Sequence, residues 1–231
     1  MSLDLIKNSI RQKPAYESKD GLIYCDDCMN IMPQMREGCV DLVVTDPPYN
    51  AKNIGPQQKT YSIGEMQLPQ REYMKFCKRW FIETQRFSRR LIFTPGISNM
   101  CHYKQPYWAI CWHKPAAVSY NRMGGYNAWE PIFVYGKIPK GKRLPQDYVL
   151  FNTLNLKKGP ESKHPCPKVL KLLKWILNTF SNEDEFVFDP FLGSGTTAVA
   201  AKQLGRKFVG IEINPDYVKI AIDRLRQEIL L

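Results

Sequence analysis

The sequence predicts an α/β fold with a doubly wound, mostly parallel sheet, and three observations support this class. Short runs of β-branched and aromatic residues alternate with segments whose apolar residues recur every three or four positions. A strand pattern at 186–188 leads through a glycine-rich turn into a helix pattern at 196–204. The chain has 231 residues, 44% of them apolar, which is enough for one large core. We expect a single domain over 1–231.

Apolar patterning places the elements of the first half of the chain. A short strand is expected at 22–25, followed by a helical turn up to Met35. The β-branched run within 40–45 predicts a buried strand. The polar segment 51–69 contains two glycines and two prolines and is expected to be a long mobile loop. A helix over 70–87 and strands at 91–94, 108–112 and 131–135 follow.

The second half begins with a segment that lacks a regular pattern. Residues 136–160 are rich in Lys, Gly and Pro and are expected to be irregular. An apolar stripe predicts a helix over 169–180, preceded by two prolines. The last elements are expected to be a strand at 186–188, a helix at 196–204, a strand at 208–213 and a helix that begins at Asn214 and Pro215.

Composition argues against membrane and metal-binding classes. No run of about 18 apolar residues could span a membrane, and the first residues lack the apolar stretch of a signal peptide. We therefore expect a soluble, cytoplasmic protein with no membrane partner. The seven cysteines lack framework spacing, so structural disulfides are not expected. Cys25 and Cys28 are spaced like metal ligands, but a closed zinc site needs a second pair, so no metal is expected.

The net charge of +11 is concentrated in the middle of the chain. Between residues 71 and 150 there are 14 Lys and Arg residues against 4 Asp and Glu residues. Tyr and Trp residues are interleaved with these cations, and such a mixture suits phosphate attraction and base stacking. A nucleic-acid partner is therefore favoured over a basic surface that is merely solvated. The candidate phosphate contacts are Arg122, Lys137, Lys142 and Arg143.

A glycine-rich turn between a strand and a helix is a candidate binding site. In FVFDPFLGSGTT, Gly193 and Gly195 lie where an α/β sheet offers a ligand a helix N-terminus and an approachable backbone. Glu212 follows Gly195 by 17 residues, close to the spacing of an acid that binds ribose hydroxyls. The third glycine of the dinucleotide motif is missing, and Asp189 favours a cationic ligand over a pyrophosphate. We expect a nucleoside with an ammonium or sulfonium group; the alternative is a tight turn without a ligand.

Three motifs together resemble the S-adenosylmethionine-dependent DNA amino-methyltransferases, which methylate N6 of adenine or N4 of cytosine. They are DPPY at 46–49, DPFLGSGTT at 189–197 and GIEINPDY at 210–217. HPCPK at 164–168 is a weaker match, because Val169 replaces the proline that usually ends this element. The catalytic motif precedes the cofactor motif, which is similar to the β-type arrangement.

The resemblance implies a fold, a cofactor and a partner. The fold is a Rossmann-like, seven-stranded sheet of the class I methyltransferase type, with a small basic, loop-rich insertion. Segment 136–160, where a target-recognition region would lie, is short. The cofactor is S-adenosylmethionine, and the substrate is double-stranded DNA in a restriction-modification setting. A homodimer is permitted by the resemblance without being required.

The resemblance also assigns the catalytic motif, whose residues suit the chemistry of an exocyclic amine. The lone pair of this amine is delocalised into the base, so the nitrogen must be held in line with the methyl group. Asp46 can accept one N–H and the carbonyl of Pro47 the other, while Pro47 and Pro48 restrict the backbone. Tyr49 offers a ring for the flipped base, and stacking of roughly 1–3 kcal/mol offsets much of the cost of flipping.

The cofactor contacts are likewise assigned by resemblance. Glu212 is expected to bind the ribose, Asp27 the adenosine end and Lys168 the carboxylate. An N-cap role is an equal alternative for Asp27, and for Lys168 a surface position in a first helical turn is slightly favoured. The methionine and sulfonium end is assigned to Asp189, Pro190, Phe191, Gly193, Ser194, Gly195 and Thr196.

Four functions remain open at this point. N6 of adenine is favoured because DPPY is the usual form in the adenine enzymes, whereas the cytosine-N4 relatives more often carry SPPY. Cytosine N4 is therefore the second choice. Methylation of RNA or of protein amides is a further class, in which NPPY is the more usual form. A non-catalytic DNA-binding module is opposed by the intact Asp46, Tyr49 and glycine-rich turn.

Overall fold

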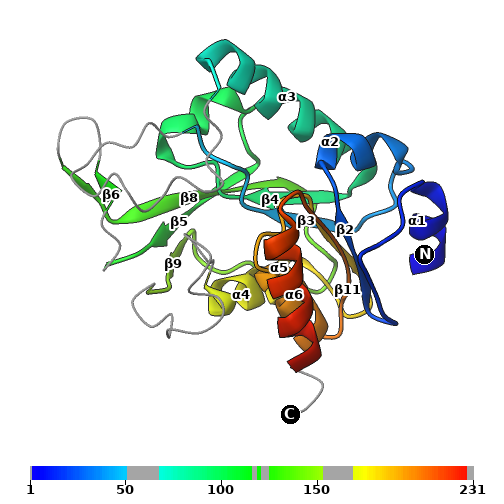
Figure 1. The fold of residues 1–231 in the computed structure, drawn as a ribbon. Helices are drawn as coiled ribbons and strands as arrows, with labels where there is room; N and C mark the ends of the chain where they lie inside the picture. Colours follow the sequence, from blue (N-terminus) through cyan, green and yellow to red (C-terminus); the bar gives the residue numbers. More distant parts are fainter. Residues whose placement is uncertain (1, 51–67, 116–118, 121–124, 153–168, 228–231) are drawn as a thin grey trace.

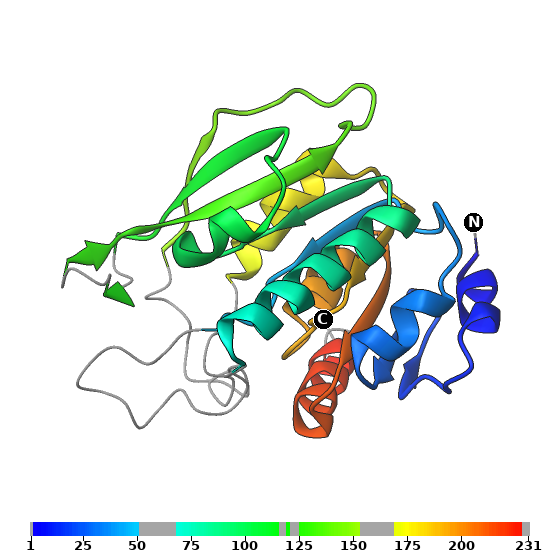
Figure 2. The same ribbon diagram turned by 90° about the horizontal axis from the view of Figure 1, so that it is seen from above.

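A mixed β-sheet forms the centre of the protein, with a layer of helices on each side (Figure 1 and Figure 2). The computed structural model describes residues 2–50, 68–115, 119–120, 125–152 and 169–227. Nine of the strands formed by these residues belong to this sheet. In spatial order they are β1 (Tyr16–Glu17), β2 (Gly21–Cys25), β11 (Lys207–Glu212), β10 (Phe186–Asp189), β3 (Leu42–Thr45), β4 (Arg90–Phe93), β8 (Trp129–Gly136), β5 (Trp108–His113) and β9 (Tyr148–Leu150).

The predicted seven-stranded, mostly parallel sheet is confirmed as the central part of this larger sheet. Strands β2, β11, β10, β3 and β4 are all parallel to one another. Strand β8 is antiparallel to both β4 and β5, so it is the reversed strand among the seven from β2 to β5. Strands β1 and β9 extend the sheet at its two edges. A separate antiparallel pair is formed by β6 (Ser119–Tyr120) and β7 (Tyr126–Asn127).

The helices divide between the two faces of the sheet. Figure 1 shows α3 on one side and α4, α5 and α6 on the other. No helix among the described residues is both long and apolar enough to cross a membrane. The first face carries α1 (Leu3–Ser9), α2 (Cys28–Ile31), η1 (Met32–Gln34), α3 (Gln70–Phe87) and η2 (Ile97–His102), and the second carries α4 (Leu170–Phe180), α5 (Thr196–Gln203) and α6 (Pro215–Gln227).

Two apolar cores fill the spaces between these layers. Val43 packs into the core under α3, whereas its neighbour Val44 packs into the core under α4, α5 and α6. Central parallel strands are covered on both faces, which is why they are apolar along their whole length. Trp80 of α3 is fully buried, and its ring lies 5.0 Å from that of Phe93. The helix predicted over 70–87 is confirmed at both ends.

The structure contains several short elements that were not predicted, among them β1, β6, β7, η2, β9 and α1. Residues 136–160 were expected to be irregular, but β9 forms within them at Tyr148–Leu150 and pairs with β5. Only Val149 of this strand is buried, so three residues of alternating exposure give too short a pattern to detect. The helix α1 was not predicted, because Ile6 is its single buried residue and leaves almost no apolar stripe. The expected mobile loop at 51–69 lies almost wholly outside the described residues.

One edge of the sheet collects polar residues at the ends of five neighbouring parallel strands. At this edge β2 leads to Asp27, β11 ends at Glu212, β10 ends at Asp189, and β3 and β4 are followed by Asp46 and Thr94. Ligands of doubly wound sheets bind at the carboxyl ends of the strands. We call this row of strand ends the carboxyl edge.

Candidate active site

The DPPY motif at the end of β3 forms a closed hydrogen-bond network with the end of β4. The Tyr49 hydroxyl donates to Oδ1 of Asp46 at 2.5 Å and lies 3.0 Å from the carbonyl oxygen of Thr94. The Thr94 hydroxyl donates to the same oxygen of Asp46. Burial and the nearby Asp46 carboxylate raise the pKa of Tyr49 well above its ordinary value. The hydroxyl therefore keeps its proton and serves as a donor.

The backbone of this motif is also tied to α3. Tyr73 is fully buried in α3, and its hydroxyl donates to the carbonyl oxygen of Pro48 at 3.1 Å. Asn50, which follows the motif, makes two side-chain hydrogen bonds to the backbone of Leu68, at 2.8 and 2.9 Å. Pro47 is buried. The motif is thus held by contacts with Thr94 after β4 and with Tyr73 of α3. The role predicted for the Pro47 carbonyl stays a prediction.

Asp189, at the end of β10, is a buried acid with three donors around it. Its Oδ1 accepts from the Thr45 hydroxyl at 2.6 Å and from the amide of Phe191 at 3.0 Å, and its Oδ2 accepts from the Thr197 hydroxyl at 2.6 Å. Burial raises the pKa of Asp189 to about 6, despite these donors. Because Thr45 immediately precedes Asp46, this bond links the glycine-rich turn to the DPPY motif.

The glycine-rich turn depends on two left-handed residues. Gly193 has φ of 54° and Gly195 has φ of 83°, a region that side chains rarely adopt. A Cβ added at Gly195 would lie 2.6 Å from Cβ of Ala221 in α6. A larger residue at this position would therefore meet both backbone strain and a clash. Glycine lets the turn and α6 approach each other closely.

Arg224 of α6 is a residue of this site that the sequence did not reveal. Its Nη1 donates to the carbonyl oxygen of Ser194 at 2.7 Å and to its hydroxyl at 3.2 Å. The same nitrogen lies 3.0 Å from the hydroxyl of Thr196. Ser194 and Thr196 were predicted to contact a cofactor, and the structure shows their hydroxyls in contact with Arg224. An arginine two turns into an amphipathic helix carries no local signal for such a contact.

Glu212 connects the turn to the beginning of α6. Its Oε2 accepts from the amide of Gly193 at 2.8 Å, and its Oε1 accepts from the amide of Asn214 at 2.8 Å. Burial raises the pKa of Glu212, and these amide donors oppose that rise. The side chain is half-buried. The structure thus brings Glu212 together with the turn, and its predicted contact with a ribose stays a prediction.

The remaining residues predicted around the turn and β2 are placed as follows. Asp27 caps α2, because its Oδ1 accepts from the amide of Met29 at 2.8 Å. This is the alternative role weighed for it, although Asp27 also lies at the carboxyl edge. Pro190 is buried. The half-buried ring of Phe191 lies 5.7 Å from that of Trp80 and is fixed against α3.

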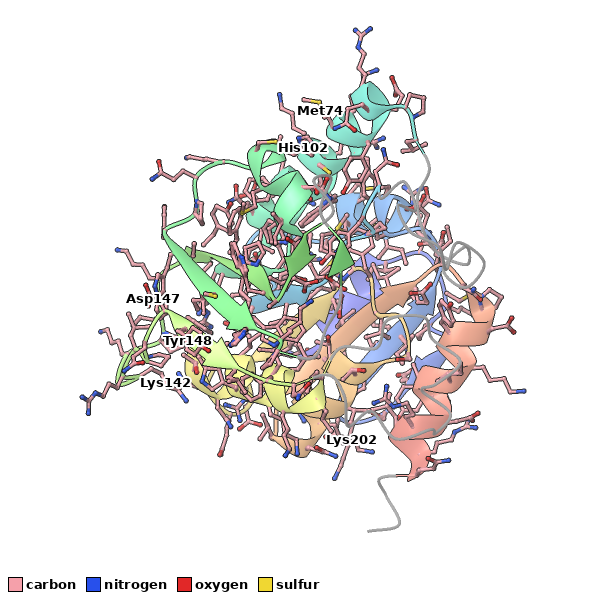
Figure 3. The ribbon with its side chains drawn as sticks, turned by 90° about the vertical axis from the view of Figure 1, so that its left-hand side faces the viewer. Met74, His102, Lys142, Asp147, Tyr148 and Lys202 are labelled. Carbon is pink, nitrogen blue, oxygen red and sulfur yellow. The ribbon has the colours of Figure 1, made fainter. Side chains whose placement is uncertain are left out.

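The predicted phosphate contacts are not brought together with the DPPY motif. Lys137 follows Gly136, which pairs with Arg90 at the start of β4, so it lies at the edge opposite Asp46. Figure 2 shows the chain after β8 at the far end of the molecule from the first turn of α3. Lys142 donates to the carbonyl oxygen of Asn178 in α4 at 2.9 Å. Figure 3 shows Lys142 apart from His102, whose ring lies 5.9 Å from that of Tyr73, the residue bonded to Pro48 of the motif.

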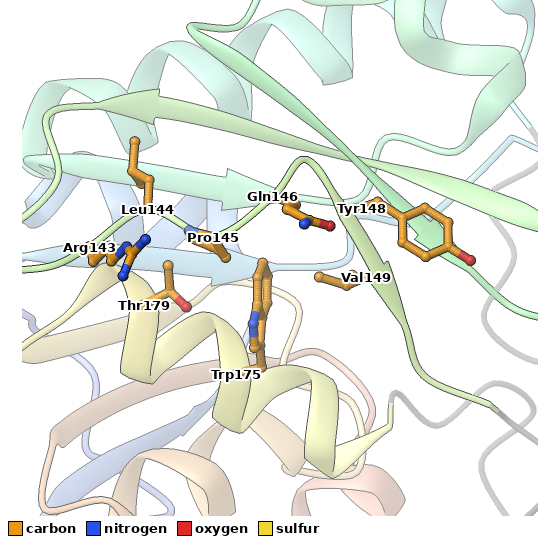
Figure 4. A pocket seen from close by; sticks show the side chains of 8 residues that line it. All are labelled: Arg143, Leu144, Pro145, Gln146, Tyr148, Val149, Trp175 and Thr179. Carbon is orange, nitrogen blue, oxygen red and sulfur yellow. The ribbon is translucent and has the colours of Figure 1, made fainter.

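Arg143 lines an open pocket on the same side of the molecule as Lys142. The pocket lies between β9 and α4, and Trp175 and Thr179 line it from α4 (Figure 4). DNA contact by Arg143, Lys137 and Lys142 therefore stays a prediction without support from their position. Arg122 and Lys168, the other two cations assigned from the sequence, lie outside the described residues.

A charged pair lies where β5 and β8 reach the carboxyl edge. Lys114 and Glu130 form an ion pair of 2.6 Å, and both side chains are mostly buried. The Lys114 ammonium lies 4.8 Å from the ring centre of Trp112. The negative charge of Glu130 also contributes to the raised pKa of Tyr49. Trp129, the residue before Glu130, is 38% exposed at the same edge.

Comparisons with known proteins find one family throughout. The family model N6_N4_Mtase, described as DNA methylase, matches residues 40–223. Type II methyltransferase M.ScaI of Streptomyces caespitosus is 30% identical over 267 residues, which cover 94% of this chain and 84% of that protein. Type II methyltransferase M2.DpnII of Streptococcus pneumoniae is 29% identical, with coverage of 94% and 93%.

Solved structures agree on the fold. The PvuII DNA methyltransferase (cytosine-N4-specific) superimposes with a TM-score of 0.69 at 19% identity, covering 93% of this chain and 89% of that one. The complex of M1.HpyAVI with SAM gives a TM-score of 0.62 at 22% identity, covering 89% and 98%. At these identities the similarity shows a shared fold.

Proposed function

This chain belongs to the N6/N4 DNA methylase family, and on that basis we propose that it transfers a methyl group from S-adenosylmethionine to N6 of a flipped-out adenine in double-stranded DNA. The observation that carries the proposal is the bond from Thr45 to Asp189, because it joins two sites. On one side lies the acid that would face the amine, Asp46, and on the other the turn that would hold the cofactor. Relatives named type II methyltransferases support a restriction-modification role.

The chemistry of the carboxyl edge fits a cationic nucleoside cofactor. When bound, S-adenosylmethionine supplies an electrophilic methyl group on a sulfonium. Asp189 is an acid in the turn and favours the cationic end of such a molecule. Glu212 is half-buried at the end of the next strand and can accept hydrogen bonds from ribose hydroxyls. Gly193 and Gly195 leave the backbone of the turn open to close approach.

The DPPY network would act on the amine of the base. Asp46 accepts one N–H of the amine, and the carbonyl of Pro47 accepts the other, so the nitrogen lone pair turns out of the base plane. The ring of Tyr49 stacks on the flipped base. Methyl transfer would leave the nitrogen cationic and acidic, and its proton would then pass through the hydrogen bond to Asp46 and on to water. No residue with a shifted pKa is therefore required as a general base.

Cytosine N4 is the second candidate base. The observation in its favour is the fold similarity to the PvuII enzyme, whose name states cytosine-N4 specificity. The form of the motif, DPPY, favours adenine. Both bases present an exocyclic amine, so Asp46 and Pro47 would play the same roles. The two candidates differ in the base that must fit beside Tyr49 and not in the chemistry.

Mass spectrometry of nucleosides separates these candidates. The purified chain is incubated with S-adenosylmethionine and either duplex DNA, total RNA or cell protein, and each product is hydrolysed. We expect 6-methyladenine in the duplex DNA and no methylated product from RNA or protein. If N4-methylcytosine is found without 6-methyladenine, cytosine and not adenine is the base that the protein methylates. Transfer to RNA or protein alone would overturn the proposal.

The pKa of Asp189 predicts how cofactor affinity depends on pH. Burial raises this pKa to about 6, so the side chain is mainly ionised at pH 7.5 and mainly neutral near pH 5. A cationic cofactor prefers the ionised form. We expect the dissociation constant for S-adenosylmethionine, measured by calorimetry, to be flat above about pH 7 and to rise roughly tenfold per unit below about pH 6.

Stability changes with pH in the opposite direction, which separates weak binding from unfolding. A carboxyl whose pKa is raised by folding stabilises the protein at low pH, and this contribution is lost as pH rises from about 4 to about 6. Protonation of Asp189 therefore weakens binding without weakening the fold. Asp189→Asn should flatten the pH profile of binding. An unchanged profile in this variant would assign the pH dependence to another group.

A further inference from the structure

Thr94, which follows β4, contacts the catalytic motif through two of its atoms and the residue before the motif through a third. Its hydroxyl donates to Oδ1 of Asp46, and its carbonyl oxygen lies 3.0 Å from the Tyr49 hydroxyl. Its amide donates to the carbonyl oxygen of Thr45 at 3.3 Å. Thr94 is 5% exposed, so its own side of these contacts is shielded from water. We propose that Thr94 is a positioning residue that holds Asp46 and Tyr49 in their reactive arrangement, an inference that rests on the function proposed above.

The topology of the sheet explains why Thr94 reaches this place. Strands β3 and β4 are parallel neighbours, and Thr45 lies opposite Phe93 in their register. The next residue of each strand, Asp46 and Thr94, therefore leaves the sheet side by side. The bond between their side chains extends the pairing of the strands by one step into the site. The position of Asp46 is thus set by the sheet and not only by its own loop.

The conformation of Thr94 is restricted by its own chemistry and by the next residue. Threonine is branched at Cβ, which limits rotation about χ1 and fixes the direction of the hydroxyl. Pro95 follows and confines the backbone of Thr94 to extended conformations. The orientation of the hydroxyl is therefore established without help from the ligand. A donor prepared in this way can hold one carboxylate oxygen still while the rest of Asp46 receives the amine.

The hydroxyls of Tyr49 and Thr94 both donate to the Asp46 carboxylate. The Tyr49 oxygen carries one proton, and its shortest contact, at 2.5 Å, is with Oδ1 of Asp46. The Thr94 hydroxyl donates a second hydrogen bond to the same oxygen. The two donors lie in the segments that follow β3 and β4, and together they restrict rotation of the carboxylate about χ2. With the Thr94 hydroxyl removed, Oδ1 of Asp46 would lose one of these two donors, and the carboxylate would be held less firmly in its plane.

Gly96 completes the support under the Tyr49 ring. Its φ is +73°, and a Cβ built there would lie 3.3 Å from Cε1 of Tyr49. The missing side chain lets the ring lie close to the backbone of the turn. Thr94, Pro95 and Gly96 thus form a platform that holds the hydroxyl of Tyr49 and backs its ring. The base would then stack on the side of the ring away from Gly96.

Paired substitutions of Thr94 test the inference. Thr94→Val keeps the shape and the backbone carbonyl but removes the hydroxyl, whereas Thr94→Ser keeps the hydroxyl. We expect the valine variant to lower kcat by roughly 10- to 100-fold, the scale of a small misplacement of a catalytic group. KM for DNA and the dissociation constant for S-adenosylmethionine should stay within about twofold of the wild-type values, because the proposed role gives the Thr94 hydroxyl no contact with DNA or with the cofactor. The serine variant should recover most of kcat.

A matched control separates positioning from loss of stability. Thr84 is fully buried in α3, and its hydroxyl bonds only to the backbone of its own helix, at 3.0 Å to the carbonyl oxygens of Trp80 and Phe81. Thr84→Val should change thermal stability about as much as Thr94→Val does while leaving kcat unchanged. Equal loss of kcat in both valine variants, or no rescue by Thr94→Ser, would overturn the positioning role.

A double-mutant cycle with Tyr49 and a crystal structure complete the test. Tyr49→Phe keeps the ring but removes the other donor, and its effect on kcat should combine non-additively with that of Thr94→Val. The crystal structure of Thr94→Val should show the Asp46 carboxylate turned from its present plane. An unmoved carboxylate would overturn the inference whatever the activity. Absence of DNA methylation by the wild-type protein would instead count against the proposed function.

Discussion

Asp46→Ala is expected to lower the single-turnover rate of DNA methylation by at least roughly 10³-fold while leaving affinity for S-adenosylmethionine within about twofold. The variant removes the acceptor that holds the amine, and it also leaves the hydroxyls of Tyr49 and Thr94 without their shared partner. Cofactor affinity should persist, because Asp189 and Glu212 reach the turn through bonds that do not involve Asp46. Rapid-quench kinetics and calorimetry measure the two quantities separately.

Two further variants define what Asp46 contributes. Asp46→Asn keeps one acceptor oxygen but loses the charge, so we expect a rate between those of the alanine variant and the wild type. Asp223 is an exposed acid on α6, and Asp223→Ala should methylate DNA at the wild-type rate. A fully active Asp46→Ala protein would contradict the mechanism. Loss of cofactor affinity together with activity would show that Asp46 supports the cofactor site instead.

Gly195→Ala should have the second large effect, on both stability and cofactor binding. Alanine at φ of +83° is strained, at about 1–2 kcal/mol, and its Cβ would lie 2.6 Å from Cβ of Ala221. Moving α6 away to relieve the clash would also disturb the contacts of Arg224 with Ser194. We expect a loss of about 2–5 kcal/mol in the free energy of unfolding and at least tenfold weaker binding of S-adenosylmethionine.

Gly205 provides a matched control, because it shares the backbone conformation but not the crowding. Its φ is +70°, and a Cβ there would have no neighbour within 4 Å. Gly205→Ala should therefore cost only the backbone strain, about 1 kcal/mol, and leave cofactor binding intact. Chemical denaturation of both variants isolates the cost of the clash. Equal destabilisation of the two, with normal binding in both, would contradict a tight contact between the turn and α6.

The parts of the fold that were predicted from sequence are those with strong local patterns. The long apolar stripe of α3 defined both of its ends, and the strand, turn and helix around Gly195 were recognisable from a few residues. The family resemblance, which rested on DPPY and the glycine-rich turn, is confirmed by the family model. Strand β9 was missed because three residues next to a Lys-rich segment show no usable period.

The parts of the site that sequence could not reveal depend on distant partners. Thr94 contacts Tyr49 and Asp46, which precede it by 45 and 48 positions in the chain. Arg224 contacts Thr196 and Ser194, which precede it by 28 and 30 positions. No local pattern signals such contacts. The turn Thr94-Pro95-Gly96 after a buried strand was the one available clue, because such turns lie at the carboxyl edge. Lys137 was grouped with the site by charge alone, and the reversed direction of β8 places it at the other edge.

The position of the transferred methyl group tests the central claim most directly. Duplex DNA is incubated with the wild-type protein and S-adenosylmethionine that carries a ¹³C-labelled methyl group, and the nucleosides are analysed by mass spectrometry and NMR. The arrangement of Asp46, Pro47 and Tyr49 predicts the label on an exocyclic nitrogen, with N6 of adenine as the expected atom. Label on C5 of cytosine, or no label in DNA, would contradict the account.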